Sequence, residues 1–74
     1  MMRGPRLPRT VRLPADTMIG AAHLRIALNA SRSVINRWRR TYNFPPSHRD
    51  GSTTWTMTAQ VADWLTAHGA QVIR

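Results

Sequence analysis

The chain has 74 residues, which allows one small domain. A domain of about that length buries only about 60% of the surface that its unfolded chain exposes. Its basic residues are 11 arginines against three aspartates, a formal net charge of +8, and this excess predicts a polyanionic partner, either nucleic acid or an anionic membrane surface. With no cysteine, disulfides and cysteine-based zinc sites are excluded, and no apolar run suits a membrane span or signal peptide. We therefore expect a cytoplasmic protein.

Residues 1–14 are rich in proline and arginine and poor in apolar side chains, so we predict a flexible basic arm that adds nothing to the core. Four of its arginines recur at every third position: Arg3, Arg6, Arg9 and Arg12. A polyproline II segment has three residues per turn and would align them along one edge. Such a segment is either a solvated tail or an arm that contacts DNA in the minor groove.

We assign residues 15–69 to the folded domain. Its first part, MIGAAHLRIAL from Met18 to Leu28, is mostly apolar and free of proline, which predicts a short buried helix. Two apolar stripes at helical spacing indicate contacts on two sides: Ala21, Leu24, Ala27 and Leu28 in one, and Ile19, Ala22 and Ile26 in the other.

The second predicted helix follows a short break, with Ser31 as its N-cap, and runs to about Thr41. At 100° per residue its apolar side chains fall on one side: Val34, Ile35, Trp38 and Tyr42. The remaining surface is polar and basic.

The adjacent prolines Pro45 and Pro46 cannot continue this helix. Asp50-Gly51 is a two-residue hairpin turn signal, and Ser52 to Met57 is a β-branched and aromatic run, so we predict a β-hairpin. A third helix is predicted from Ala59 to His68, with Thr58 as its cap and Gly69 as its stop. Residues 70–74 form a short tail whose conformation the sequence leaves open.

These elements predict an α+β fold of the winged helix-turn-helix class, with three short helices and a two-stranded β-hairpin wing between the second and third. In this class the second helix enters the major groove of DNA. Arginine pairs with guanine and asparagine with adenine, and the first half of such a helix faces the bases. We therefore predict Arg32, Ser33, Asn36 and Arg37 as base readers, Arg39 and Arg40 as phosphate contacts, and His48, Arg49 and Ser52 as contacts of the wing.

An ordinary solvated basic face is the alternative interpretation of these residues. Trp38, Phe44, Trp55 and Trp64 could stack on bases, but a chain this short needs them in its core. The sequence predicts neither an enzyme nor a cofactor, because its three aspartates are isolated and its histidines lack metal-ligand spacing.

The segment SRSVINRWRRTYNFPPSHRDGSTTW, residues 31–55, resembles phage excisionases and AlpA-type prophage regulators, a MerR-like family. The similarity covers roughly residues 18–68. The matching positions are Ser31, Arg37-Trp38, Phe44-Pro45-Pro46, Arg49, Gly51, Trp55 and Trp64-Leu65. The first helix departs from the pattern, with Arg25, Asn29 and Ala30 at positions that commonly hold alanine, glycine and a hydrophobic residue.

The resemblance implies sequence-specific binding to double-stranded DNA in a bacterial cell, associated with the nucleoid. Excisionases bend DNA so that a tyrosine integrase performs excision, and often bind side by side, which implies the integrase and further copies of this chain as partners. Other family members regulate transcription, and that role stays open. A more remote alternative is an RNA-binding or membrane-active cationic protein.

Overall fold

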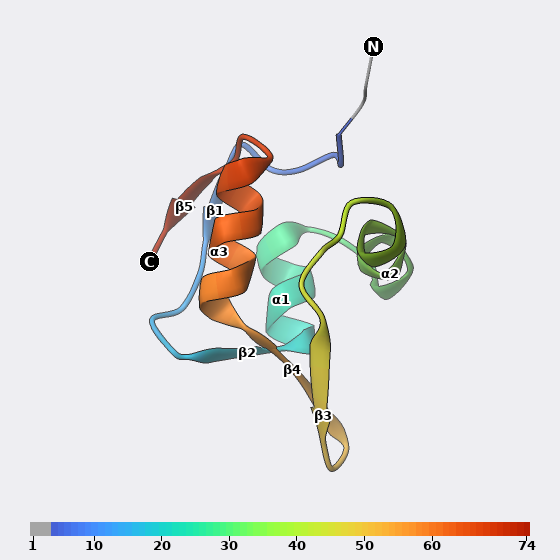
Figure 1. The fold of residues 1–74 in the computed structure, drawn as a ribbon. Coiled ribbons are helices and arrows are strands. Elements are labelled where there is room, and N and C mark those ends of the chain that lie inside the picture. The colour runs from blue at the N-terminus through green and yellow to red at the C-terminus, as the bar shows by residue number, and fades with distance from the viewer. Residues whose placement is uncertain (1–3) are drawn as a thin grey trace.

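The computed structural model describes residues 4–74, which form three helices and five short strands (Figure 1). In chain order the elements are β1 (Thr10–Arg12), β2 (Met18–Gly20), α1 (Ala21–Leu28), α2 (Arg32–Thr41), β3 (Ser47–Asp50), β4 (Thr53–Met57), α3 (Thr58–Ala67) and β5 (Gln71–Ile73). The strands make two sheets, a parallel pair β1-β5 and an antiparallel sheet in the order β2-β4-β3. The architecture is α+β.

The predicted winged helix-turn-helix is wrong. Two strands precede α1 and a fifth follows α3, whereas the prediction held its only two strands between the second and third helices. The β3-β4 hairpin does form, but β2 pairs along the other edge of β4, and β1 pairs with β5 in a second sheet. Both additional pairings join segments that are distant in sequence, so no local turn signal predicts them.

Strand β1 incorporates part of the segment predicted to be a flexible arm. Val11 pairs with Val72, and the backbone N–H of Leu13 donates to the carbonyl of Ile73 at 2.8 Å. Both Val11 and Leu13 are buried. The prediction that nothing in residues 1–14 enters the core is therefore wrong for these two side chains.

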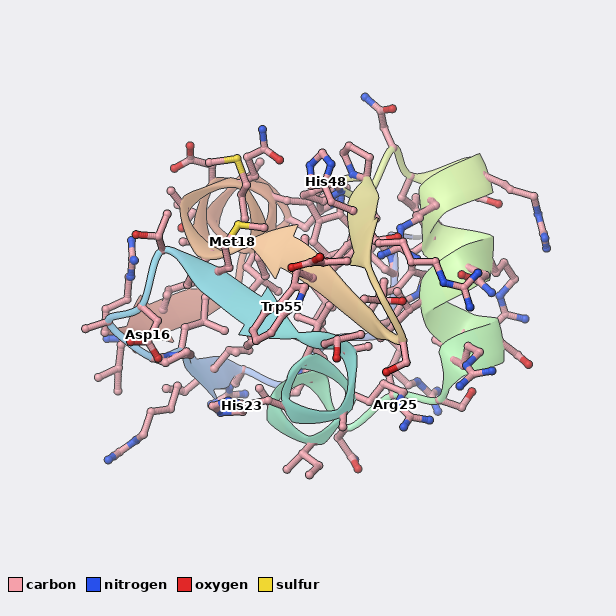
Figure 2. All side chains as sticks on the ribbon, turned by 90° about the horizontal axis from the view of Figure 1, so that it is seen from below. Asp16, Met18, His23, Arg25, His48 and Trp55 are labelled. Carbon is pink, nitrogen blue, oxygen red and sulfur yellow. The ribbon has the colours of Figure 1, made fainter. Side chains whose placement is uncertain are left out.

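The three-stranded sheet has one covered and one open face, because directly opposed residues of antiparallel strands point to the same side. Ile19 and Thr56 are opposed and buried. Trp55 lies opposite Gly20 and His48 on the other face, which Figure 2 shows from below. The prediction that Trp55 is a core residue is wrong, because Trp55 is only half-buried. Its ring lies against Gly20: a Cβ added to Gly20 would be 3.8 Å from the Trp55 ring atom Cζ3.

The hairpin turn and the start of α1 also differ from prediction. Asp50 pairs with Thr53, so the two loop residues are Gly51 and Ser52, one position later than expected. Gly51 has φ of +64°, a conformation that side chains with a Cβ disfavour. Met18–Gly20, predicted as the start of the first helix, is a strand. The prediction that a second apolar stripe of α1 contacts the core is also wrong, because Ile26 in that stripe is 79% exposed.

Helix α3 ends at Ala67, one residue before the predicted end, and begins without the predicted cap. Gly69 has φ of +88°, and the N–H of Ala70 donates to the Leu65 carbonyl at 2.9 Å, which closes the helix end. Thr58 is the first helical residue rather than a cap. It is fully buried, and its hydroxyl has no hydrogen-bond partner in the described structure.

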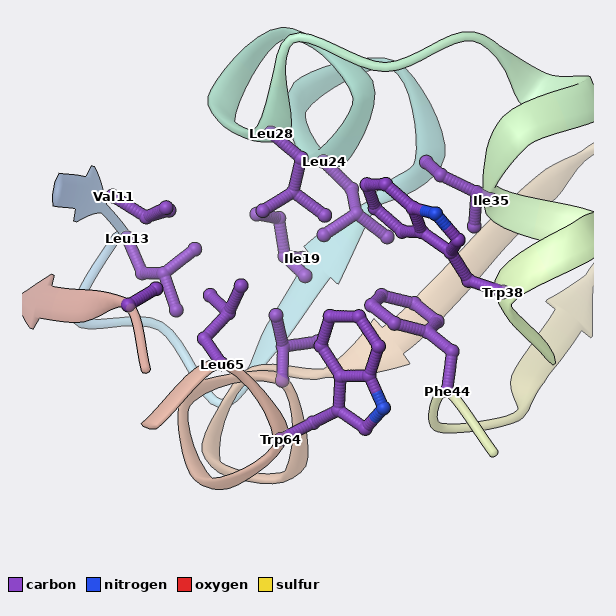
Figure 3. Close-up of a cluster of buried hydrophobic side chains, with 12 residues drawn as sticks. Val11, Leu13, Ile19, Leu24, Leu28, Ile35, Trp38, Phe44, Trp64 and Leu65 are labelled. Carbon is purple, nitrogen blue, oxygen red and sulfur yellow. The ribbon is translucent and has the colours of Figure 1, made fainter. Parts of the chain in front are cut away.

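The core lies between the helices and both sheets, with an aromatic cluster at the end nearest α2 (Figure 3). The ring centroids of Trp38 and Trp64 are 5.6 Å apart, and those of Phe44 and Trp64 are 4.7 Å apart. Trp64 Nε1–H also donates to the carbonyl of Tyr42 at 2.9 Å. The prediction of a core role is confirmed for Trp38, Phe44 and Trp64, which fix the C-terminal end of α2 against α3.

Candidate nucleic-acid interface

Helix α2 presents its polar face outward because its start and its apolar side are fixed. The Ser31 hydroxyl accepts a hydrogen bond from the backbone N–H of Val34 at 3.2 Å, which confirms the predicted N-cap. Ile35 and Trp38 are buried. After the helix, Asn43 adopts φ of +59° and turns the chain away toward β3.

The polar side chains of α2 form two stripes. At 100° per residue, Arg32, Asn36 and Arg39 lie on one line along the helix, and Ser33, Arg37 and Arg40 lie on a second line roughly 100° further round. The first stripe borders the β3-β4 hairpin. The second is exposed to solvent. The structure thus divides the six predicted contact residues by helix face, whereas the sequence divided them by position along the helix.

Arg39 is held rigidly within the first stripe. Its Nε–H donates to the Pro45 carbonyl at 3.1 Å, and Nη1–H donates to Asn36 Oδ1 at 3.0 Å. Its guanidinium carbon lies 5.5 Å from the ring centroid of Phe44. Partial burial lowers the pKa of Arg39 from its ordinary value, yet a guanidinium remains protonated at neutral pH. The result is a cation with a fixed position and little rotamer entropy left to lose.

A pocket of about 370 Å³ separates α2 from the hairpin. We call it the α2-hairpin pocket. Arginines reach it from α1, α2 and β3, and its remaining lining is small, hydroxyl-bearing or aliphatic: Ala21, Leu24, Arg25, Arg32, Ile35, Asn36, Arg39, Ser47, Arg49, Ser52, Thr54 and Thr56. Of the described residues that line it, four are cationic and none is acidic, so the pocket concentrates positive potential.

The three residues predicted as hairpin contacts do not lie on one face of the sheet. Arg49 and Ser52 line the α2-hairpin pocket. His48 is opposed to Trp55 and therefore belongs to the open face of the sheet (Figure 2). The alternation of side chains along a strand separates His48 from Arg49.

The predicted arm does not approach this pocket as a unit. Arg3 lies outside the described residues, and Arg6 is exposed. Arg9 and Arg12 are exposed at β1, which lies at the opposite side of the molecule from α2 (Figure 1). Pairing of β1 with β5 decides this placement.

Sequence reasoning missed Arg25 as a site residue. It belongs to α1, lies between α1 and α2 (Figure 2) and lines the pocket. Its Nε is buried and has no hydrogen-bond partner among the described residues. A charged residue inside the apolar run of Met18 to Leu28 was the signal that could have identified it.

No helix within residues 4–74 has the length and apolar character needed to cross a bilayer. The same residues bring together no group of three His or Asp side chains that could hold a metal ion. Comparison with protein-family models, curated proteins and solved structures found no match to this chain.

Proposed function

We propose that this protein binds duplex DNA, with α2 in the major groove and the β3-β4 hairpin against the adjacent backbone. The observation that carries the proposal is the set of arginines on α2 and around the neighbouring pocket, with no acidic side chain among the described residues that line that pocket. An α-helix fits the major groove of B-DNA, and a surface of this charge gains affinity by displacing the cations condensed on phosphates.

Within this interface we assign base reading to the N-terminal half of α2, where Arg32, Ser33, Asn36 and Arg37 are all exposed. Arginine can pair with guanine and asparagine with adenine, which assigns those two bases to Arg37 and Asn36. Arg40 lies one turn further and would hold the backbone. A domain this small should bind one site weakly, so neighbouring copies on DNA would raise the affinity.

The test is quantitative binding to the duplex that the native protein selects from a random pool. Arg37→Ala should reduce discrimination at particular base pairs by about 1–3 kcal/mol, whereas Arg40→Ala should weaken all sequences alike. Arg74→Ala is the matched control, because it removes an exposed arginine outside α2 and the hairpin. Equal losses of Arg37→Ala and Arg40→Ala on every sequence would refute the assignment of base readers.

Competition decides between duplex DNA and the other polyanions. Native protein should bind duplex in preference to single-stranded RNA and to vesicles containing anionic lipid. Its affinity should fall with salt, with a slope of about −0.9 for each phosphate contacted. Preference for RNA or vesicles would overturn the proposed function.

The motif resemblance further supports an excisionase role, in which several copies on adjacent sites bend DNA for a tyrosine integrase. The competing role is transcription regulation. Footprinting separates them: an array of adjacent protected sites within a recombination site supports the excisionase, and a single site at a promoter supports the regulator.

A further inference from the structure

We propose that the α2-hairpin pocket is a phosphate-binding site with Arg25 as one of its ligands. This inference rests on the proposed function for the source of the phosphate, which we take to be one backbone phosphate of the bound duplex. It adds a residue of α1 to an interface that otherwise consists of α2 and the hairpin.

The first support is the state of Arg25. The residue lies in the same helix as the buried Leu24 and Leu28, and its Nε is itself buried without a hydrogen-bond partner among the described residues. A buried donor is normally satisfied, so an unpaired one points to a missing acceptor. Arg25 also lines the α2-hairpin pocket, so an oxyanion bound there would lie beside its guanidinium group, which carries such donors.

The second support is the accumulation of like charge. Arg25, Arg32, Arg39 and Arg49 converge from three elements on one pocket, and within residues 4–74 no acidic side chain lines it. Their mutual repulsion disfavours the empty pocket. Leu24 and Ile35 also contribute apolar surface, which lowers the local dielectric and strengthens attraction for an anion.

The third support is preorganisation. The hydrogen bonds of Arg39 to Pro45 and Asn36 use Nε–H and Nη1–H and fix the guanidinium plane, while a guanidinium carries five N–H donors. Donors thus remain to engage a ligand. Ser52 and Thr54 line the same pocket, and a hydroxyl group can serve as a neutral donor. Planar guanidinium donors match phosphate oxygens in pairs.

The lining also indicates which part of a nucleic acid enters. In the part of the chain that the structure describes, it contains no aromatic side chain on which a base could stack. Trp55 lies on the opposite face of the sheet, and the aromatic cluster is buried. The pocket therefore suits a phosphate group rather than a nucleobase.

The experiment measures duplex affinity against salt for the native chain and for Arg25→Gln, with Arg74→Gln as the charge-matched control. Removing one of the four arginines weakens a single phosphate contact and should reduce the slope of log K against log salt by at most about 0.9. We expect this change for Arg25→Gln and none for Arg74→Gln. Arg49→Gln, on an exposed strand, should reproduce the change and serves if Arg25→Gln fails to fold.

A second measurement identifies the source of the phosphate. The Arg25 Nε–H resonance, assigned by its absence from Arg25→Gln, is followed while duplex or inorganic phosphate is added. Duplex binding with a shifted Arg25 resonance supports the proposal. Duplex binding with no shift and unchanged slopes in both pocket variants overturns it and leaves the proposed function intact.

The remaining outcomes separate the two proposals further. If duplex does not bind but inorganic phosphate shifts the Arg25 resonance of the native chain, the phosphate site stands and duplex DNA is rejected as its source. If neither ligand affects the protein, both proposals fail.

Discussion

Replacing Leu13 by alanine tests whether β1 belongs to the core. Leu13 is 3% exposed, and the substitution removes three carbon atoms, worth about 2.4 kcal/mol of transfer free energy at roughly 0.8 kcal/mol each. A residual cavity adds to this, so we expect a loss of about 3 kcal/mol. A 74-residue domain has a total stability of roughly 4–11 kcal/mol. The loss should therefore lower Tm by about 12–24 °C.

The assay is thermal unfolding followed by circular dichroism, with Arg12→Ala as the control. Arg12 precedes Leu13 in the chain and its side chain is exposed, so its replacement should change the free energy of unfolding by less than about 0.5 kcal/mol. If Leu13→Ala and Arg12→Ala melt at the same temperature, β1 does not pack into the core, and the reasoning from its burial is refuted.

Three further substitutions test other parts of the structure. Trp64→Phe removes the indole N–H that donates to the Tyr42 carbonyl and should cost about 1–3 kcal/mol in urea unfolding; an unchanged midpoint would contradict a stabilising role for this bond. Ser31→Ala removes the cap of α2 and should cost about 1 kcal/mol, whereas Ser33→Ala, at an exposed position, should cost much less; equal costs would refute the cap. Arg25→Leu eliminates the buried unpaired Nε and should raise stability by about 1 kcal/mol, measured as a higher Tm; a lower Tm would show that the Arg25 side chain stabilises the fold.

Local signals predicted the elements whose determinants lie within a few residues. The Ser31 cap, the apolar side of α2 and the Gly69 stop each act within a turn or two of the helix, and all three are confirmed. The hairpin was predicted from the Asp50-Gly51 pair, and only its turn moved by one residue. Such features depend on backbone conformation and capping, which adjacent residues largely determine.

The second sheet was missed because its stability is not local. Val11 and Leu13 alternate with Arg12, the pattern of a half-buried strand, but the segment has only three strand residues among prolines. Its partner is β5, about sixty residues further along the chain. An isolated two-stranded pair is marginal in water, so β1 and β5 depend on the core formed by α1 and α3.

The sequence predicted most of the residues of the candidate site but not how the fold groups them. The sequence identified the arginines of α2 and Arg49 of the hairpin, because charge and helical spacing are visible without a fold. It grouped His48 with Arg49, although strand alternation sends them to opposite faces. It left out Arg25, because a residue of α1 becomes part of the pocket only when α1 packs beside α2 and the hairpin.

The sequence by itself determined a small, arginine-rich, cysteine-free chain with an amphipathic second helix and a hairpin after it. Charge, periodicity and turn chemistry are properties of neighbouring residues, so they can be recognised in the sequence without the fold. Only the tertiary structure decided that part of the proline-rich N-terminal segment is a core strand, that the architecture has two sheets, and that four arginines from three elements share one pocket. Each of these depends on contacts between segments distant in sequence, and the free energy that selects among such contacts comes from the packed core as a whole.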